Sequence, residues 1–285
     1  MMKHLYFVLL LFPMVAMGEN LSKYFKNEFK STYFVFHYND EIRTIPQFAT
    51  FTDGFIDVIN REFFKANFNY PINVYVLKDK AAMQKFLIEK LHVNNPPSFG
   101  MYLPRIRGFV TREDSGFGTF THEIMHPLIE TNLPNAPVWA QEGIPTFFEK
   151  FFGYWDGKKL VLEFGFQNPW RIEKLGDKII SLDIESIVKG KRDYGQCEQR
   201  MVAVFLYRHG KFKKFLDQIR TNQKNGYNTF VEAAFEKKMS ELKPLWKQYL
   251  AEVCRERPQI RKISTSQVFE SREQFETFMK SKGLH

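Results

Sequence analysis

Cysteine is nearly absent from this sequence, and its scarcity narrows the folds and sites open to the chain. The 285 residues include only Cys197 and Cys254, so a disulfide-dense fold and a zinc site of clustered thiolates are both excluded. The two cysteines can form one disulfide in an exported protein, or they can stay as buried free thiols. Internal repeats and polar low-complexity tracts are also missing, which excludes a repeat architecture and a disordered chain.

Long apolar runs are missing after the first residues. The run at 5–17 is too short to span a bilayer, follows the positive Lys3, and leads into the small-x-small pattern of Ala16 and Gly18. We therefore expect residues 1–18 to be a secretory signal peptide and the protein to be periplasmic or secreted. The alternative is a buried N-terminal helix or a retained anchor. We expect no stable membrane span after cleavage.

Positive charge is in excess but is not concentrated. The formal net charge is +9, spread along the chain with some density at Arg255, Arg257, Arg261 and Lys262. Because no aromatic-basic motif accompanies it, the excess favours a solvated basic face and no nucleic-acid partner. Hydrophobic residues make up 44% of the chain and include 31 phenylalanines, which suffices for a sizeable aromatic core.

Hydrophobic periodicity predicts an α+β fold. Strands are expected at 32–38, 72–77, 99–103 and 107–110, and helices at 45–67 and after the capping residue Asp79. A helix beginning near Asp114 or Ser115 is expected to kink or end early at Pro127, and a second opens near Pro137. Asp156-Gly157 predicts a hairpin between 151–155 and 159–164. The section 165–189 looks irregular, with a helix possible only around 183–188.

The rest of the chain is predicted to be helical. Expected helices follow a capping pair at Asp193 and Gln196, cover 212–221, 228–237 and 240–255, and end with one opened by Ser271 and Gln274 and closed by Gly283. We predict a signal peptide at 1–18 and a catalytic domain formed by an α/β part at 19–152 and a helical part at 153–255. A tail at 256–285 carries the short terminal helix, and 258–266 is expected to be a linker.

The segment 122–126 has the pattern His-Glu-x-x-His. On a helix, His122 and His126 point from one face one turn apart, so both imidazoles can bind one ion. Glu123 lies beside that face, where it can act as a general base toward an activated water. With seven histidines in the chain, such a motif arises by chance on the order of one time in a hundred. A catalytic zinc site needs a third protein ligand.

Glu142 is the best candidate for that third ligand. It lies on the next predicted helix, across a loop long enough for that helix to turn back toward the motif. Glu130, Glu149 and His4 are weaker candidates, since Glu130 would need an unbroken helix through Pro127. Glu149 could also orient a ligating histidine, although a solvated surface glutamate is the preferred interpretation.

The two motifs together resemble the gluzincin zinc metallopeptidases. The His-Glu-x-x-His segment, followed by Trp139-Ala140-Gln141-Glu142-Gly143 and an aromatic pair with an acid at 147–149, is most similar to the bacterial peptidase-MA-like group. The resemblance extends over roughly residues 30–252. It implies a zincin-like fold, one Zn²⁺ on His122, His126 and Glu142, and Glu123 as the base. Pro145 departs from the pattern, and the Gly-x-Met-x-Asn motif of the aminopeptidase relatives is absent, which favours an endopeptidase.

The resemblance also implies a donor to the oxyanion from the start of a later helix. Tyr194 is the candidate for this role beside Glu123, against the alternative that it is a packing residue, and His209 is the runner-up. The strand within 98–112 could bind a substrate backbone by strand addition. The predicted function is a zinc-dependent peptidase acting on peptides or proteins. The alternatives are a catalytically silent relative that binds a peptide or cell-envelope partner, and a metal-free basic adaptor. The oligomeric state is not predicted.

Overall fold

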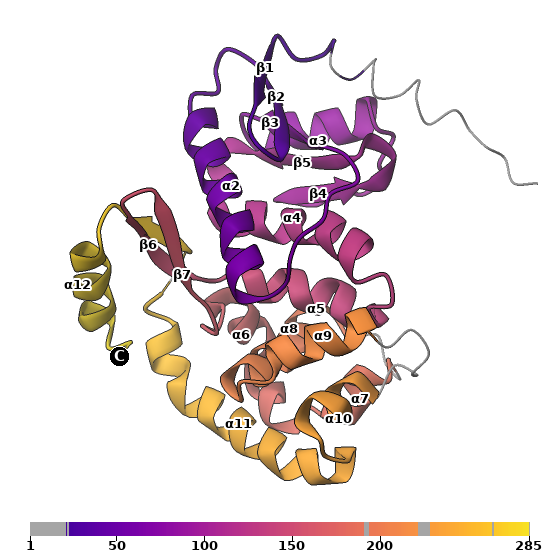
Figure 1. Cartoon of the computed structure of the whole chain (residues 1–285), viewed down its shortest axis with the longest axis vertical. Coiled ribbons are helices and arrows are strands. Elements are labelled where there is room, and N and C mark those ends of the chain that lie inside the picture. Colours follow the sequence, from indigo (N-terminus) through magenta and orange to yellow (C-terminus); the bar gives the residue numbers. More distant parts are fainter. Residues whose placement is uncertain (1–20, 22, 191–193, 222–228, 264, 285) are drawn as a thin grey trace, which may run out of the picture.

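Two sheets of unequal size, with helices packed around them, make up the computed structural model of the chain (Figure 1). The structure describes residues 21, 23–190, 194–221, 229–263 and 265–284. The predicted α+β class is confirmed. The predicted signal peptide at 1–18 and the predicted capping residue Asp193 lie outside the described residues.

The larger sheet is mixed and lies in the N-terminal part. Its strands are β1 (Asn27–Lys30), β2 (Phe34–Tyr38), β3 (Ile72–Leu77), β4 (Gly100–Leu103) and β5 (Gly108–Arg112), in the order β1-β2-β3-β5-β4. The three central strands are parallel, and β1 and β4 run antiparallel along the edges. All but β1 were predicted. β1 carries mostly exposed side chains, so it has no apolar alternation by which to recognise it.

Helices cover both faces of this sheet. Alternate residues of β3 point to opposite sides, with Val74 and Val76 in one hydrophobic cluster and Tyr75 and Leu77 in the other. Helix α2 (Ile45–Glu62) packs on the first side together with α4 (Phe117–Asn132), and α3 (Lys80–Glu89) covers the second. Asp79 caps α3 as predicted, because its carboxylate accepts a hydrogen bond from the Ala82 backbone N–H at 2.9 Å.

The start of α4 differs from the prediction. Glu113–Ser115 forms a 3-10 turn. The α-helix begins only after Gly116, because the φ of +77° at that residue is not helical and interrupts the helical backbone. Asp114 and Ser115 are therefore not its caps. The expected early end at Pro127 is also wrong, since α4 continues to Asn132. A proline removes one hydrogen bond, here to the Glu123 carbonyl, and burial of the helix in the core compensates for that loss.

Helix α5 (Val138–Phe148) follows directly and contains Pro145 without ending there. The predicted hairpin is present as β6 (Phe152–Asp156) and β7 (Lys159–Glu163). The section expected to be irregular contains a helix that was missed, α6 (Pro169–Leu175), and a 3-10 segment, Gly176–Ser181. The remaining helices before the tail are α7 (Ile184–Val188), α8 (Gln196–Arg208), α9 (Phe212–Thr221), α10 (Thr229–Phe235) and α11 (Met239–Ile260).

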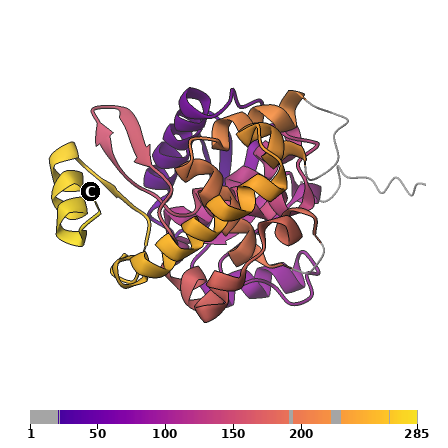
Figure 2. The same ribbon diagram turned by 90° about the horizontal axis from the view of Figure 1, so that it is seen from below.

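The C-terminal tail returns to the body of the protein. Strand β8 (Gln267–Phe269) pairs in parallel with β6 and completes the smaller sheet, and α12 (Arg272–Lys282) packs beside it (Figure 2). Ser271 caps α12 as predicted. The predicted linker at 258–266 is wrong in part, because α11 continues through Pro258 to Ile260 and Ser266 is held by hydrogen bonds.

The two cysteines of the described chain do not form a disulfide. Cys197 is buried and Cys254 exposed, and both are free thiols.

Arg257 and Arg261 near the end of α11 form ion pairs with Glu173 of α6, so part of the basic excess links two helices. None of the described helices combines the length and the apolarity that crossing a membrane requires.

Candidate metal centre

Three side chains from two neighbouring helices converge on one point. His122 and His126 lie one turn apart on α4, and Glu142 faces them from α5. The Nε2 atom of His122 is 3.5 Å from one carboxylate oxygen of Glu142, and the Nε2 atom of His126 is 4.0 Å from the other. One ligand atom from each residue lies within 4.8 Å of the other two. The predicted convergence of these three residues is therefore present.

This donor set fits a zinc ion. Two imidazole nitrogens and one carboxylate oxygen are ligands that zinc accepts, with bonds of about 2.0–2.2 Å. In a tetrahedral site such bonds place the donors roughly 3.3–3.5 Å apart. The distances of 3.5 and 4.0 Å between the histidines and Glu142 lie close to this range.

The packing of α5 sets the position of Glu142. Trp139 is buried against Phe215 of α9, and Gly143 lies against α8. A Cβ atom at Gly143 would come within 3.1 Å of the Gln199 carbonyl oxygen, so the absence of a side chain lets the two helices approach closely. Pro145 lies beyond Glu142 and does not divert it from the histidines.

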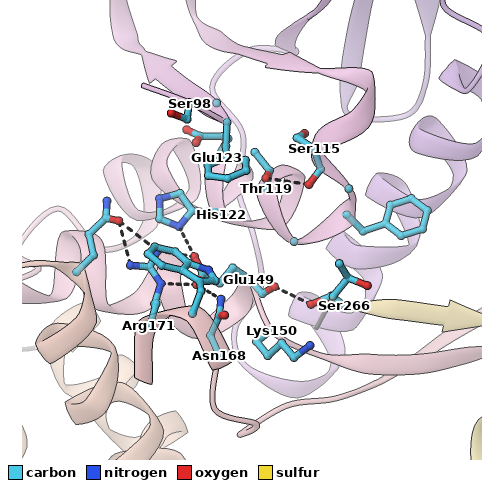
Figure 3. Close-up of a pocket in the computed structure, with 18 of the residues that line it drawn as sticks. Ser98, Ser115, Thr119, His122, Glu123, Glu149, Lys150, Asn168, Arg171 and Ser266 are labelled. Atoms are coloured by element: carbon cyan, nitrogen blue, oxygen red, sulfur yellow. Dashed lines mark hydrogen bonds and ion pairs between the residues drawn. The ribbon is translucent and has the colours of Figure 1, made fainter. Parts of the chain in front are cut away.

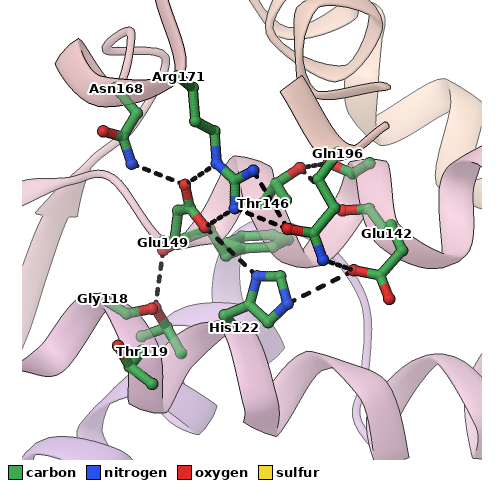
Figure 4. Close-up of polar contacts among 12 residues, drawn as sticks. Gly118, Thr119, His122, Glu142, Thr146, Glu149, Asn168, Arg171 and Gln196 are labelled. Atoms are coloured by element: carbon green, nitrogen blue, oxygen red, sulfur yellow. Dashed lines mark hydrogen bonds and ion pairs between the residues drawn. The ribbon is translucent and has the colours of Figure 1, made fainter. Parts of the chain in front are cut away.

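A closed ring of polar contacts supports the ligands (Figure 4). Gln196, at the start of α8, donates from Nε2 to Glu142 at 2.8 Å, and its carbonyl oxygen accepts from both terminal nitrogens of Arg171. Arg171 in turn binds the Glu149 carboxylate with two nitrogens. Glu149 lies 3.4 Å from Nδ1 of His122, which closes the ring.

Glu149 is not the solvated surface residue that the sequence favoured. Its side chain is 10% exposed and also accepts a hydrogen bond from Asn168 at 2.7 Å. Burial alone would raise the pKa of Glu149, but the hydrogen bonds from Arg171 outweigh it and hold the pKa far below its usual value. Its contact with His122 is longer than a good hydrogen bond, and among the described residues Nδ1 has no other hydrogen-bond partner. Glu149 therefore orients His122 and leaves Nε2 free to bind.

Glu123 lies beside the ligands in a confined place. It is 5% exposed, and a Cβ atom at Gly100 would come within 2.9 Å of its carboxylate oxygen, so strand β4 passes directly over it. Burial raises the pKa of Glu123 to about 7, although the charge of His122 and a hydrogen bond with the Tyr102 backbone oppose the rise. A carboxylate with such a pKa can accept and release a proton near neutral pH.

The two histidines have opposite electrostatic environments before any metal is bound. Burial alone would lower the pKa of His122, but its contacts with Glu142 and Glu149 raise it to about 10. Burial and the charge of His122 lower the pKa of His126 to about 4. Burial alone would raise the pKa of Glu142, but its hydrogen bond with His122 is the main reason that the pKa is lowered instead. The contacts with Glu142 and Glu149 thus favour the charged form of His122, whereas burial favours the neutral form of His126.

The other sequence candidates have different roles. The Tyr102 hydroxyl donates to Glu130, which is not part of the ligand group. The ring nitrogen Nδ1 of His209 contacts the Phe205 carbonyl oxygen at 2.9 Å, as expected of a helix-end residue. Tyr194 is half-buried against the core, and among the described residues its hydroxyl makes no hydrogen bond to the ligands. Its role as an oxyanion donor stays a prediction.

Two supporting residues were missed from the sequence. Gln196 was predicted only as half of a capping pair, and Arg171 lies in the section expected to be irregular. Asn168 and Pro169, the residue before α6 and its first residue, were the signal that a short helix begins there, since proline favours the first turn.

A cavity opens on one side of the centre (Figure 3). It measures about 340 Å³, and His122 and Glu123 form part of its wall. It lies between the start of α4, the segment before β4 and the start of α6, and Ser266 from the tail closes one side.

Comparison with known proteins assigns the chain to no family. No family model matches the sequence, and no curated protein matches it.

Proposed function

We propose that this protein is an exported zinc-dependent metallopeptidase with a zincin-like fold. The observation that carries the proposal is the convergence of His122, His126 and Glu142 within 4.8 Å, with Glu123 buried beside them. The arrangement of elements supports it as well. A mixed sheet with an antiparallel edge strand lies over the motif helix, and the third ligand comes from the helix that follows.

The residues of the chain divide the chemistry between them. Zinc held by the three ligands would polarise a peptide carbonyl and lower the pKa of a water molecule to about 7. Glu123 would take the proton of the attacking water and pass it to the leaving amine, because it lies buried beside the three ligands. Glu149 and Gln196 keep His122 and Glu142 in position through both transfers. We assign the second oxyanion donor to Tyr194.

Strand β4 provides a place for a peptide backbone. It pairs with β5 on one side only and lies at the edge of the described sheet, directly over Glu123. An extended substrate can add to such an edge by main-chain hydrogen bonds, with its scissile bond near the base. Because strand addition requires no free terminus, this geometry favours an endopeptidase over an aminopeptidase.

The proposal is tested by exchanging the base while keeping the ligands. We expect the Glu123→Gln variant to retain zinc and lose at least about 100-fold of its activity on unstructured protein substrates, the usual scale of a lost general base. Zinc content by elemental analysis and cleavage by mass spectrometry measure the two properties. Glu89→Gln is the matched control, since Glu89 is exposed at the end of α3.

Equal cleavage by wild type and Glu123→Gln would refute the catalytic role. Zinc binding with no cleavage by either would instead support the catalytically silent relative, which keeps the site for binding alone. A protein that binds no zinc would refute the metal site itself.

A further inference from the structure

We propose that the cavity beside Glu123 is a pocket for a large apolar side chain of the substrate, with Phe99 and Trp170 as its specificity-determining walls. That the occupant is a substrate side chain rests on the proposed function, but binding to the pocket can be tested without catalysis. Its position is the first argument. His122 and Glu123 line the cavity, so a peptide bond placed at the metal centre brings a neighbouring side chain to its mouth.

The exposed aromatic residues are the second argument. Phe99 is 52% exposed and Trp170 50% exposed, whereas most large hydrophobic side chains in the described chain are buried. They come from two distant segments, the turn before β4 and the start of α6, yet both line this one cavity together with Phe117. An aromatic or large aliphatic group between them would remove apolar surface from water on both sides. The volume of about 340 Å³ accommodates such a group.

Three hydroxyl groups of the wall, those of Ser266, Ser115 and Thr119, already make hydrogen bonds within the protein. Ser266 donates to the Glu149 carbonyl and accepts from the Phe151 N–H. Ser115 donates to the Arg112 carbonyl, and Thr119 donates to the Ser115 carbonyl. At these three positions a polar ligand would have to compete with existing hydrogen bonds.

The charged groups of the wall are also occupied. The charge of Arg171 is neutralised by Glu149, and its guanidinium also donates to Gln196. It therefore has no free pair of N–H groups with which to bind an acidic ligand. Lys150 is the exception, because its ammonium has no hydrogen-bond partner in the described chain. However, that residue is only 1% exposed, and the nitrogen lies 4.5 Å from the centre of the Phe152 ring. The Lys150 ammonium lies over the Phe152 ring, whereas Phe99 and Trp170 are half exposed at the cavity, so an apolar occupant is favoured over an acidic one.

Trp170 provides a direct readout, since the chain has only four tryptophans. We would record indole N–H signals of metal-free and zinc-loaded protein while adding N-acetyl-phenylalanine amide, N-acetyl-alanine amide or N-acetyl-glutamate amide. Trp170→Phe identifies the signal. We expect the Trp170 signal to move saturably with the phenylalanine probe, at least roughly tenfold more tightly than with the alanine probe. The buried Trp139 and Trp246 should not respond.

Variants make the test specific. Phe99→Ala should weaken the phenylalanine probe by roughly tenfold and leave the alanine probe unchanged. The control is Ile88→Ala, an equally exposed apolar residue on α3 at 51%. An unmoved Trp170 signal overturns the inference. So does preferential binding of the glutamate probe that is lost in Lys150→Met, which would show an anion pocket.

These outcomes are separable from those of the proposed function. The titration needs neither metal nor turnover, so a pocket that binds phenylalanine in a protein that cleaves nothing refutes only the peptidase. Cleavage of a peptide library without preference for a large apolar residue beside the scissile bond, combined with a silent Trp170, refutes only the pocket.

Discussion

Glu149 shows how a single buried carboxylate can organise a site without being one of the candidate ligands. It contacts His122 on one side and Arg171 and Asn168 on the other, so its charge is balanced by groups that it also positions. A buried carboxylate pays a desolvation penalty that only such partners offset. The same contacts fix which nitrogen of His122 faces Glu142.

Replacing that carboxylate should weaken metal binding. We expect Glu149→Gln to lower zinc affinity by about 10–100-fold, the usual effect of losing a partner of a ligating histidine. Arg171 would also lose its buried counter-charge, so the variant should be less stable by about 3–5 kcal/mol. Competition with a chromophoric chelator measures the affinity, and urea unfolding measures the stability. Unchanged zinc affinity would show that Glu149 is only a structural partner of Arg171.

Lys150 should destabilise the protein in a pH-dependent way. Burial, aided by the charge of Arg200 and opposed by that of Glu149, lowers its pKa from 10.5 to about 7. Between these values the unfolded chain binds more protons, so the free energy of unfolding contributed by Lys150 rises with pH from about 7 to 10.5. Below pH 7 the full penalty remains, because both states are protonated.

The Lys150→Met variant should remove this penalty. We expect it to be more stable than wild type by about 1–4 kcal/mol at pH 6, with the difference shrinking toward pH 10. Urea unfolding at pH 6, 8 and 10 measures the trend, and the exposed Lys78→Met serves as control. A variant less stable than wild type at pH 6 would show that the contact with Phe152 outweighs the desolvation of the ammonium.

Among individual residues, the three candidate ligands could be predicted from the sequence, but the residues that hold them in position could not. His122 and His126 are recognisable because helical spacing alone places them together, and Glu142 follows on the next helix. Arg171 and Gln196 reach the site only through the packing of α6 and α8. No local pattern encodes that packing, so their roles could not be read from spacing.

Among the secondary-structure elements, those with strong apolar periodicity were predicted well. α9 has the predicted bounds, and α2 begins at the predicted residue but ends five residues early. Failures occurred where one residue overrides the pattern. Because Gly116 adopts a positive φ, α4 begins after it and not at Asp114 or Ser115. Helix α6 was missed because it is too short to show a full amphipathic repeat.

The contact between α4 and the turn after α5 depends on Gly118. A Cβ atom there would lie 2.4 Å from the Glu149 carbonyl oxygen, far inside normal contact. We expect Gly118→Ala to push the two segments apart, destabilise the protein by about 1–3 kcal/mol, and weaken zinc binding by moving Glu149 from His122. Thermal unfolding and zinc titration measure both effects.

Gly195→Ala is the matched control for this change. Its added Cβ atom would meet only the end of the flexible Glu198 side chain, at 3.5 Å, and Gly195 has an ordinary negative φ. If Gly118→Ala and Gly195→Ala had equal effects, the close approach at Gly118 would be unimportant.

At the scale of the whole molecule, the tail joins the smaller sheet to the metal centre. Phe275 and Met279 are buried against Phe152, while Ser266 binds both the Glu149 carbonyl and the Phe151 N–H. The periodicity of α12 was visible in the sequence. Its docking was not, because the partner strand β6 lies more than a hundred residues earlier.

Ending the chain at residue 263 should therefore weaken the site from a distance. Loss of two buried side chains removes about 3–6 kcal/mol of burial, so we expect a lower melting temperature with most helical signal retained. Zinc affinity should also fall, because Ser266 no longer holds the turn that carries Glu149. Circular dichroism and zinc titration test this, with full-length Ser266→Ala isolating the hydrogen bonds. An unchanged melting temperature would contradict the role of the tail.

The short loop at 133–137 has a consequence for how the molecule assembles. Because α4 and α5 are adjacent in the chain, the three candidate ligands lie within residues 122–142, whereas Arg171 and Gln196 come much later in the sequence. Closing a short loop costs little entropy, and contacts near in sequence form early in folding. Helices α4 and α5 can thus pair before α6 and α8 dock against them, so the three candidate ligands come together first and their supporting contacts form later.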